Sequence, residues 1–415
     1  MASDWKSHKV GELADSISVT HPFDKKRLIF LNTSDILGGK VLHNSYKDIE
    51  SLPGQAKKTI KKDDILLSEI RPANGRYAFI DFEAEDYVVS TKLMVIRARE
   101  KILPKFLFYF LTNKSITNWL QHLAESRSGT FPQITFDQIA DLNVKLPNRD
   151  EQEKIIAYID PIDEKIELNH QMNATLEKIG QALFKHWFID FEFPNEKGKP
   201  YKSSGGEIVD SEAGEIPRGW KVGKLREIGT IQPGFAFKSK DFLDEGVRVI
   251  KIRNIQDGTV SLQCEDFVND ELFQKTDEKF HLGSEDILIA MTGAELGKVG
   301  IIPKVVEPMV LNQRVGKVVS ENKFLLYFYL NKEDIQSYIK GISSASSAQG
   351  NISNTDIENI EIVVPHQESI YKFIKITTPL FQRFIYDLGE NLILSQLRDS
   401  LLPKLMSGQI RVPAG

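Results

Sequence analysis

Two short segments of the sequence have residue types that could bind a nucleotide or a metal ion. Residues 293–299 read GAELGKV and look faintly like a phosphate-binding loop, in which glycines bring backbone N–H groups to the phosphates. This segment is one residue too short and has no Ser or Thr after its lysine. Residues 81–86 read DFEAED, but the matching place in the internal repeat described below reads PKVVEP. A nucleotide site is disfavoured, and a solvated turn is the better interpretation of the acidic run.

Other patterns of catalytic residues are missing from the sequence. It contains no GxGxxG fingerprint, no His-Glu-x-x-His motif and no Asn/Asp-Pro-Pro-Tyr/Phe tetrapeptide of a base-amino methyltransferase. The eight histidines do not cluster, and the single cysteine, Cys264, excludes an intramolecular disulfide and a cysteine-based zinc cluster. We therefore expect a binding protein with no catalytic residues, no metal site and no cofactor of its own.

Polar side chains that can read the edges of DNA bases gather in several places. Residues 126–135 (SRSGTFPQIT) and 343–353 (SSASSAQGNIS) are small polar loops, and the tripeptides at 90–92 (STK) and 312–314 (NQR) lie inside strand-like runs. Two arginines flank the turn PANG, and another follows a strand-like run. The candidate DNA-binding residues are Arg71, Arg76, Lys92, Arg127, Gln133, Arg253, Asn312, Gln313, Arg314, Ser344 and Gln349.

Each of these features also has a plainer interpretation. Small polar loops are common on protein surfaces, and a single lysine is better explained by solubility. As a set, the basic residues at 24–27 (DKKR), 57–58 and 61–62 could contact phosphates. The forked donors of Gln313 and Arg314 suit adenine and guanine. The two copies of the repeat differ most at these sites, as expected of two readers of different short sequences.

Composition places the chain among globular proteins. It has 415 residues, 41% hydrophobic residues and a mean hydropathy of −0.26, so two or more domains are expected. No apolar run is long enough to cross a bilayer and no secretory signal is present, so we expect a cytoplasmic protein without membrane contact. Because the net charge is −5, any DNA contact must come from local basic patches.

The sequence is an internal duplication. DLNVKLP at 141–147 matches NIEIVVP at 359–365, an offset of 365 − 147 = 218. DDILLS at 63–68 matches EDILIA at 285–290, an offset of 285 − 63 = 222, and small loop insertions account for the difference. The opening residues from Trp5 resemble those from Trp220. The chain therefore begins a second copy at Trp220.

Each copy begins with about 145 residues of mixed pattern. Short runs rich in β-branched residues, such as RLIFLNTSDI and VRVIKIRNIQDG, end in turn residues and predict strands. The segments ILPKFLFYFLTNKSITNWLQHLA and KFLLYFYLNKEDIQSYIKGI predict amphipathic helices. The expected fold class is α+β, with a mostly β core in each copy.

Each copy ends in a long helix with a heptad rhythm. A helix over about 150–188 would be roughly 55 Å long, and its apolar stripe is too narrow to fold alone. We expect the two helices to pair as an antiparallel coiled coil related by a pseudo-two-fold axis. The predicted seam comprises Ile155, Ile159, Ile162, Ile166, Asn173, Leu176, Leu183, Leu380, Phe384, Asn391, Leu394 and Leu401, and the stripe also includes Ile179, Trp187, Phe373, Leu397 and Leu405.

Polar residues occupy two matching positions of each stripe, Asn169 with Asp387 and Asn173 with Asn391. They are either a solvated stretch or paired groups that fix register. If they fix register, Asn173 and Asn391 should face each other.

The predicted domains follow from the repeat. The first recognition domain spans 1–147 and its helix 148–190. An extended surface linker covers 191–219, the second recognition domain 220–365, its helix 366–405 and a tail 406–415.

Three motifs resemble the specificity subunit of type I restriction-modification enzymes. They are LPxxxEQxKI at 146–155, DSEAGEIPRGW at 210–220 and LLPKLMSGQIRV at 401–412. The resemblance covers essentially the whole chain. The second EQ motif departs from the pattern, because Pro365-His366-Gln367-Glu368 stands in its place.

The resemblance implies two target recognition domains that each read half of a bipartite DNA sequence, with the coiled coil as a ruler between them. It implies docking to two methyltransferase subunits and to motor-nuclease subunits, which would bind S-adenosylmethionine, ATP and Mg. The alternatives from the residues are a duplicated protein-interaction scaffold without DNA specificity, and a fused restriction enzyme, which the missing motifs disfavour.

Overall fold

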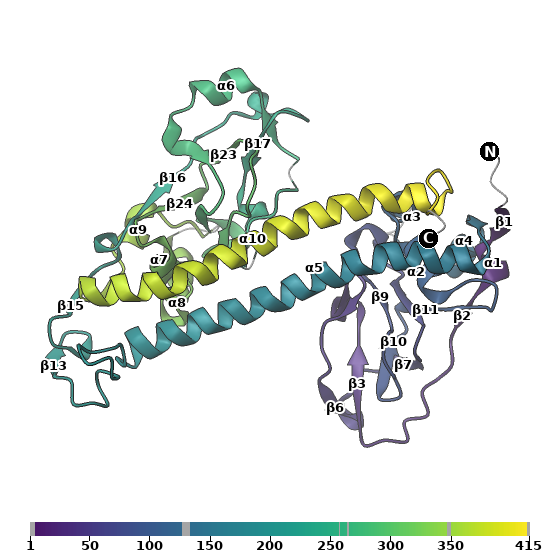
Figure 1. Ribbon diagram of the computed structural model, residues 1–415, viewed down its shortest axis with the longest axis horizontal. Helices are drawn as coiled ribbons and strands as arrows, with labels where there is room; N and C mark the ends of the chain where they lie inside the picture. Colours follow the sequence, from purple (N-terminus) through teal and green to yellow (C-terminus); the bar gives the residue numbers. More distant parts are fainter. Residues whose placement is uncertain (1–4, 127–132, 257, 264, 347–349, 413–415) are drawn as a thin grey trace. The chain divides into compact units, whose positions relative to one another are not determined.

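The computed structural model describes residues 5–126, 133–256, 258–263, 265–346 and 350–412; the side chains of 342–346 are outside the description. The chain forms two compact units. Unit 1 comprises residues 1–164 and 394–415, and unit 2 comprises residues 165–393. Both long helices contribute residues to both units (Figure 1).

Unit 1 contains two four-stranded sheets with the orders β6-β3-β10-β7 and β2-β11-β8-β9. Strand β1 pairs with β12 antiparallel, and β4 pairs with β5. The strands are β1 (Lys6–Lys9), β2 (Ala14–Ile17), β3 (Arg27–Leu31), β4 (Ile36–Leu37), β5 (Lys40–Val41), β6 (Tyr46–Asp48), β7 (Ala56–Thr59), β8 (Ile65–Ser68), β9 (Tyr77–Phe79), β10 (Tyr87–Ser90), β11 (Leu93–Ala98) and β12 (Asn143–Leu146). The helices are α1 (Val10–Leu13), α2 (Pro104–Thr112), α3 (Lys114–Glu125) and α4 (Phe136–Ala140), and α5 (Arg149–Phe184) begins here.

Unit 2 repeats this topology. Its sheets have the orders β19-β17-β23-β20 and β16-β24-β21-β22-β18, and β15 pairs with β25 as β1 does with β12. The strands are β13 (Ile208–Ser211), β14 (Gly214–Pro217), β15 (Lys221–Lys224), β16 (Thr230–Pro233), β17 (Val247–Ile250), β18 (Gly258–Thr259), β19 (Phe267–Val268), β20 (His281–Leu282), β21 (Ile287–Ala290), β22 (Val299–Ile301), β23 (Met309–Leu311), β24 (Val315–Val319) and β25 (Glu361–Val364). The helices are α6 (Asp270–Lys275), α7 (Lys323–Leu330), α8 (Glu333–Ser346), α9 (Asn354–Glu358) and α10 (Gln367–Met406). The duplication read from the sequence is therefore a duplication of fold.

The local sequence explains these elements. In β8 and β21 every residue is buried, which fits their continuous apolar runs between neighbouring strands. Helix α2 starts with Pro104 in its first turn, where a missing N–H costs nothing, and buries FLFYFL. Helices α4 and α9 each start with a capping box, from Thr135 and Ser353.

The two long helices pair antiparallel within each unit (Figure 1). In unit 1, Ile155 and Ile159 of α5 share a buried cluster with Leu402 and Leu405 of α10, while Leu401 packs against it. In unit 2, Leu176 and Leu183 of α5 pack against the cluster that contains Phe373, Phe381 and Phe384 of α10.

Two residues on the predicted stripe do not belong to it. Ile179 is 47% exposed and Leu397 is 44% exposed. The heptad count drifts along a straight helix, so positions far from the closest contact turn outward.

The polar positions of the seam are buried, which contradicts a solvated stretch, but their pairing differs from our expectation. Asn169 Nδ2 donates to Asn391 Oδ1 at 2.8 Å and to Glu390 Oε2 at 2.8 Å. Asn173 Nδ2 instead donates to the backbone oxygen of Phe384 at 3.2 Å. In an antiparallel pair, equivalent positions of two copies do not face each other unless they lie on the symmetry axis, so Asn391 meets Asn169.

Polar contacts fix each recognition domain to the long helices. In unit 1, the hydroxyl of Tyr109 donates to Asp160 and, at 3.1 Å, to Asp163 of α5. Burial raises the pKa of Tyr109, so the phenol remains a donor. In unit 2, Tyr327, which matches Tyr109 in the repeat, donates to Glu177 of α5 at 2.9 Å.

The glutamine of the EQ motif has a structural role in unit 1. Gln152 is 1% exposed; its Oε1 accepts from Leu103 N at 2.8 Å and its Nε2 donates to the Pro147 oxygen at 3.1 Å. In unit 2 the matching residue is Ile370, which is buried in the core. The departure from the motif therefore replaces a buried hydrogen-bonding group with apolar packing.

Residues 191–219 do not form the plain extended linker that we expected. They contain the hairpin β13–β14, and Phe193 stacks on both Tyr201 and Trp220 with ring centroids 4.5 and 4.8 Å apart. The prolines and glycines of this segment suggested a loop, whereas its aromatic residues pack it onto unit 2.

Candidate nucleic-acid interface

In unit 1, backbone hydrogen bonds at Glu69 hold three of the predicted DNA-binding segments together. Glu69 directly follows β8; its N–H donates to the Lys92 oxygen at 3.2 Å and its oxygen accepts from Ile134 N at 2.9 Å. The next residue, Ile70, forms a β-bridge with Gln133, and Arg71 follows it. The tripeptide at 90–92, the end of the polar loop and Arg71, which precedes the PANG turn, therefore lie side by side.

Unit 2 has the same arrangement around Met291, which matches Glu69 in the repeat. Met291 N donates to the Arg314 oxygen at 3.1 Å, and its oxygen accepts from Ile352 N at 3.1 Å. Thr292 forms a β-bridge with Asn351, and the Thr292 hydroxyl donates to the Asn351 side chain. In each unit the backbone holds a tripeptide and a polar loop against the end of a buried strand.

We expected the tripeptides inside strand-like runs, but only their first residues are so placed: Ser90 ends β10 and Asn312 forms a β-bridge with Phe235, whereas the second and third residues of each tripeptide lie in a turn. Residues 91–92 join β10 to β11, and residues 313–314 join β23 to β24, where the chain passes from one sheet to the other. Lys92, Gln313 and Arg314 are exposed, whereas Asn312 is 9% exposed. Asn312 accepts from Val315 N at 2.9 Å through its backbone, so it shapes the turn that presents its neighbours. The strand-like composition of the flanking residues concealed these short turns.

The two arginines of the PANG turn have different environments. Arg71 is exposed and adopts a left-handed backbone conformation with φ of 47°. Arg76 Nη1 donates to the backbone oxygens of Ser34 at 2.9 Å and Ile36 at 3.2 Å. Arg76 therefore braces a neighbouring loop, while Arg71 is the freer of the two to contact a ligand.

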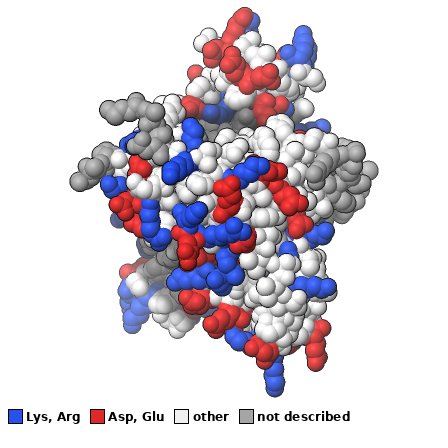
Figure 2. All heavy atoms as spheres, turned by 90° about the vertical axis from the view of Figure 1, so that its right-hand side faces the viewer, with Lys and Arg blue, Asp and Glu red and all other residues white. Residues whose placement is uncertain are grey.

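Ion pairs neutralise several of the predicted cations. Arg253 contacts Glu265 at 3.2 Å and also pairs with Asp266. Lys25, in the DKKR segment, contacts Asp86 at 2.5 Å. Figure 2 shows basic and acidic side chains interspersed on one face of the molecule. Because these cations already have carboxylate partners, they attract phosphates less than their number suggests.

Lys58 stabilises the turn at residues 91–92 through hydrogen bonds from its side chain, a role that sequence reasoning did not assign. Its Nζ donates to the backbone oxygens of Thr91 at 3.2 Å and Leu93 at 2.7 Å, on either side of Lys92. Partial burial lowers the pKa of Lys58, partly offset by the nearby Glu69. The joining residues Glu69 and Met291 carried no compositional signal, because backbone contacts define their roles. Only their matching places after DDILLS and EDILIA could have indicated them.

The remaining predicted residues cannot be placed with their side chains. Arg127 and Gln349 lie outside the described residues, and Ser344 lies in α8 without a described side chain. Within the described ranges, no group of three or more His, Cys, Asp or Glu residues is arranged to hold a metal ion. The described helices include none that is both long and apolar enough to span a membrane.

Comparisons with known proteins show the family to which the chain belongs. The family model for the type I restriction modification DNA specificity domain matches residues 2–178 and 217–381. The chain is 34% identical to the type I restriction enzyme HindI specificity subunit of Haemophilus influenzae, over 98% of this chain and 100% of that protein. It is 29% identical to the MjaIX specificity subunit of Methanocaldococcus jannaschii, over 76% and 71% of the two chains.

A solved structure shares the fold. The type I restriction-modification S subunit from M. genitalium superposes with a TM-score of 0.55 at 17% identity, over 97% of this chain and 96% of that one. The duplicated α+β units, their paired helices and the whole-length similarity to a specificity subunit lead to one assignment. The chain belongs to the family of type I restriction-modification DNA specificity subunits.

Proposed function

We propose that each unit reads one half of a bipartite DNA sequence through the turns gathered around Glu69 and Met291. The observation that carries this proposal is the repeated backbone junction, which places polar turns and loops together in both units. Gln313 and Arg314 of unit 2 are the proposed base readers; Lys92, which matches Arg314 in the repeat, is the proposed reader of unit 1, together with Arg71 and Gln133. Because the junction is alike in both units while these side chains differ, the two half-sites have different sequences.

The paired helices set the spacing between the half-sites. Buried contacts between Asn169 and Asn391 support a single register, since a shift along the seam would leave these amides without partners. A fixed register fixes the separation of the two readers along the duplex.

The chain itself performs no chemistry in this proposal. Two methyltransferase subunits dock on the coiled coil and the domain bases, and supply S-adenosylmethionine chemistry on a base flipped out of the stack. Motor-nuclease subunits, which bind ATP and Mg, complete the restriction complex in the cytoplasm. The full-length similarity to specificity subunits favours this role over a protein-interaction scaffold without DNA specificity.

The test is to map methylated bases in DNA from a host that expresses the chain with the methyltransferase subunit of its own restriction system. The expected result is one interrupted, asymmetric sequence. A continuous or random pattern of methylation, with the complex intact, would overturn the proposal.

A further inference from the structure

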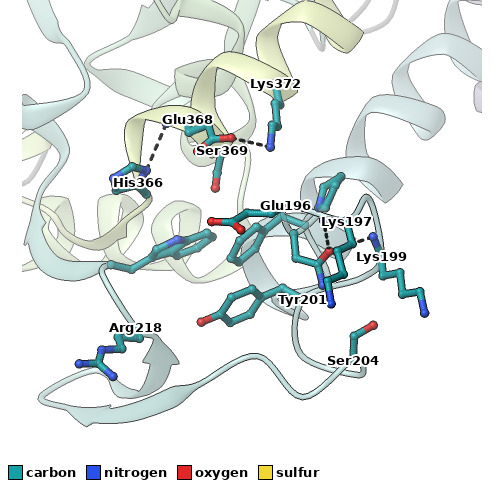
Figure 3. Close-up of a pocket in the computed structure, with 14 residues that line it drawn as sticks. Glu196, Lys197, Lys199, Tyr201, Ser204, Arg218, His366, Glu368, Ser369 and Lys372 are labelled. Atoms are coloured by element: carbon teal, nitrogen blue, oxygen red, sulfur yellow. Dashed lines mark hydrogen bonds and ion pairs between the residues drawn. The ribbon is translucent and has the colours of Figure 1, made fainter.

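A cavity of about 680 Å³ in unit 2 lies outside the proposed DNA interface. Its walls come from the aromatic segment around 193–220 and from the start of α10 (Figure 3). The lining residues used below are Lys197, Lys199, Arg218, Trp220, Ser369 and Lys372. Nothing in the proposed DNA reading assigns this cavity a role.

The equivalent place in unit 1 is filled by the chain itself. Trp5 precedes β1, which pairs with the strand leading into α5. The Trp5 indole Nε1 donates to Glu151 Oε2 at 3.0 Å, and Glu151 Oε1 lies 3.5 Å from an Arg411 guanidinium nitrogen. A Cβ added at Gly408 would lie 3.3 Å from the Trp5 ring, so the C-terminal segment covers the indole. A carboxylate therefore joins the indole N–H to a cation in unit 1.

Unit 2 has the indole and the cations but lacks this carboxylate. Trp220 precedes β15 as Trp5 precedes β1, and Ser369 stands four residues after Pro365 as Glu151 stands four residues after Pro147. Trp220 is 6% exposed and lines the cavity, and no partner for its indole N–H is found among the described residues. A serine hydroxyl is too short to replace the glutamate at this position.

The charge around the cavity favours an anionic group. Four cationic side chains line it, from Lys197, Lys199, Arg218 and Lys372. Lys372 is paired with Glu368 at 2.7 Å and Arg218 with Glu207 at 2.5 Å, so the cations without a carboxylate partner among the described residues are Lys197 and Lys199, against one further acid, Glu196. The cavity also lies at the N-terminal end of the 40-residue helix α10, where the helix dipole favours negative charge. In Figure 3, Lys372 and Ser369 point down from α10 toward the segment that carries Tyr201.

We infer that this cavity binds a carboxylate side chain from a peptide segment of a partner subunit, at the place that Glu151 fills in unit 1. The inference rests on the proposed function, because it concerns assembly of the same restriction complex. The indole N–H of Trp220 donates to the carboxylate, and Lys197 and Lys199, which have no carboxylate partner among the described residues, neutralise it.

The walls suit a peptide better than duplex DNA. Phe193, Tyr201 and Trp220 form a continuous aromatic stack, which can pack against the methylene groups of an acidic side chain. The volume falls within the range of cavities that enclose small ligands. A phosphate of a duplex would remain outside such a cavity, next to the exposed lysines.

The test measures the indole N–H resonance of Trp220 in the full-length chain by NMR, assigned with Trp220→Phe among the four tryptophans. The probes are the peptide acetyl-Leu-Glu-Glu-Leu-amide, its Gln-Gln analogue and inorganic phosphate. We expect a saturable shift with the acidic peptide and at least tenfold weaker binding of the analogue and of phosphate. No shift with the acidic peptide would overturn the inference, and so would equal binding of phosphate, which would indicate a general anion site.

The deciding variant is Ser369→Glu, which places a carboxylate where unit 1 has one. We expect it to shift the Trp220 resonance by itself and to weaken acidic-peptide binding at least tenfold. Ser337→Glu, on the exposed face of α8, is the matched control and should bind like the unmodified chain. Unchanged binding in Ser369→Glu would refute the inference. Methylation mapping tests the DNA proposal separately. A normal methylation pattern together with no peptide binding at the cavity would refute this inference and leave the DNA proposal intact.

Discussion

Replacing Arg314 with alanine tests whether the β23–β24 turn reads bases. Arg314 is exposed, and no carboxylate pairs with it among the described residues, so its guanidinium is available to a guanine edge. A bidentate contact of this kind contributes about 1–3 kcal/mol of discrimination against a wrong base. We therefore expect Arg314→Ala to reduce the ratio of specific to random DNA affinity by roughly 5- to 150-fold, at about 1.4 kcal/mol for each tenfold change.

The assay is a binding titration of the assembled complex on cognate and scrambled duplexes at one fixed salt concentration. Arg314→Lys keeps the charge but not the fork, so it should lose most of the same discrimination. Arg253→Ala is the matched control, because Arg253 is already paired with Glu265 and Asp266. Equal loss on both duplexes would refute base reading and make Arg314 a phosphate contact.

Three further predictions concern packing, a buried ion pair and spacing. Gly180→Ala should destabilise unit 2 by about 1–3 kcal/mol in chemical unfolding, because its Cβ would lie 2.5 Å from Phe328 Cζ; Gly341→Ala, where a Cβ meets nothing within 4 Å, should be neutral or slightly stabilising, and equal effects would contradict the packing argument. Arg97→Ala should destabilise unit 1 by roughly 3 kcal/mol in the same assay, because it leaves the fully buried Asp64 carboxylate without its partner at 2.7 Å. Arg99→Ala, which loses the half-exposed Asp15 and a hydrogen bond to the Glu12 oxygen, should cost clearly less than Arg97→Ala, and a similar loss in both variants would refute this reasoning. Inserting seven residues into both α5 and α10 should lengthen the coil by about 10 Å and widen the gap in the methylated sequence by about three base pairs, whereas an unchanged gap would exclude the coil as the ruler.

The duplication and the long helices could be predicted because they leave regular patterns in the sequence. Apolar residues must be buried in every strand and helix, so they recur at regular spacing. They appear as matching strands such as DDILLS and EDILIA and as apolar residues at heptad spacing. The same patterns predicted that α5 and α10 pair antiparallel.

Features that depend on contacts between distant segments could not be predicted in the same way. The pairing of Asn391 with Asn169 follows from the register of two helices and not from either sequence alone. Arg76 stays a predicted DNA ligand, but the hydrogen bonds of its guanidinium to the backbone oxygens of Ser34 and Ile36 could not be read from the sequence. The aromatic stack of Phe193, Tyr201 and Trp220 was concealed within a segment whose glycines and prolines suggested a linker.

Residues 220–365 can be replaced with the corresponding domain of another specificity subunit, and the methylated sequence of the resulting complex can then be mapped. This domain swap tests most directly whether each unit reads its own half of the DNA sequence. One half-site should change to that of the donor, while the other half-site and the gap should stay the same. A change in both half-sites, or in neither, would contradict the claim that each unit reads its own half.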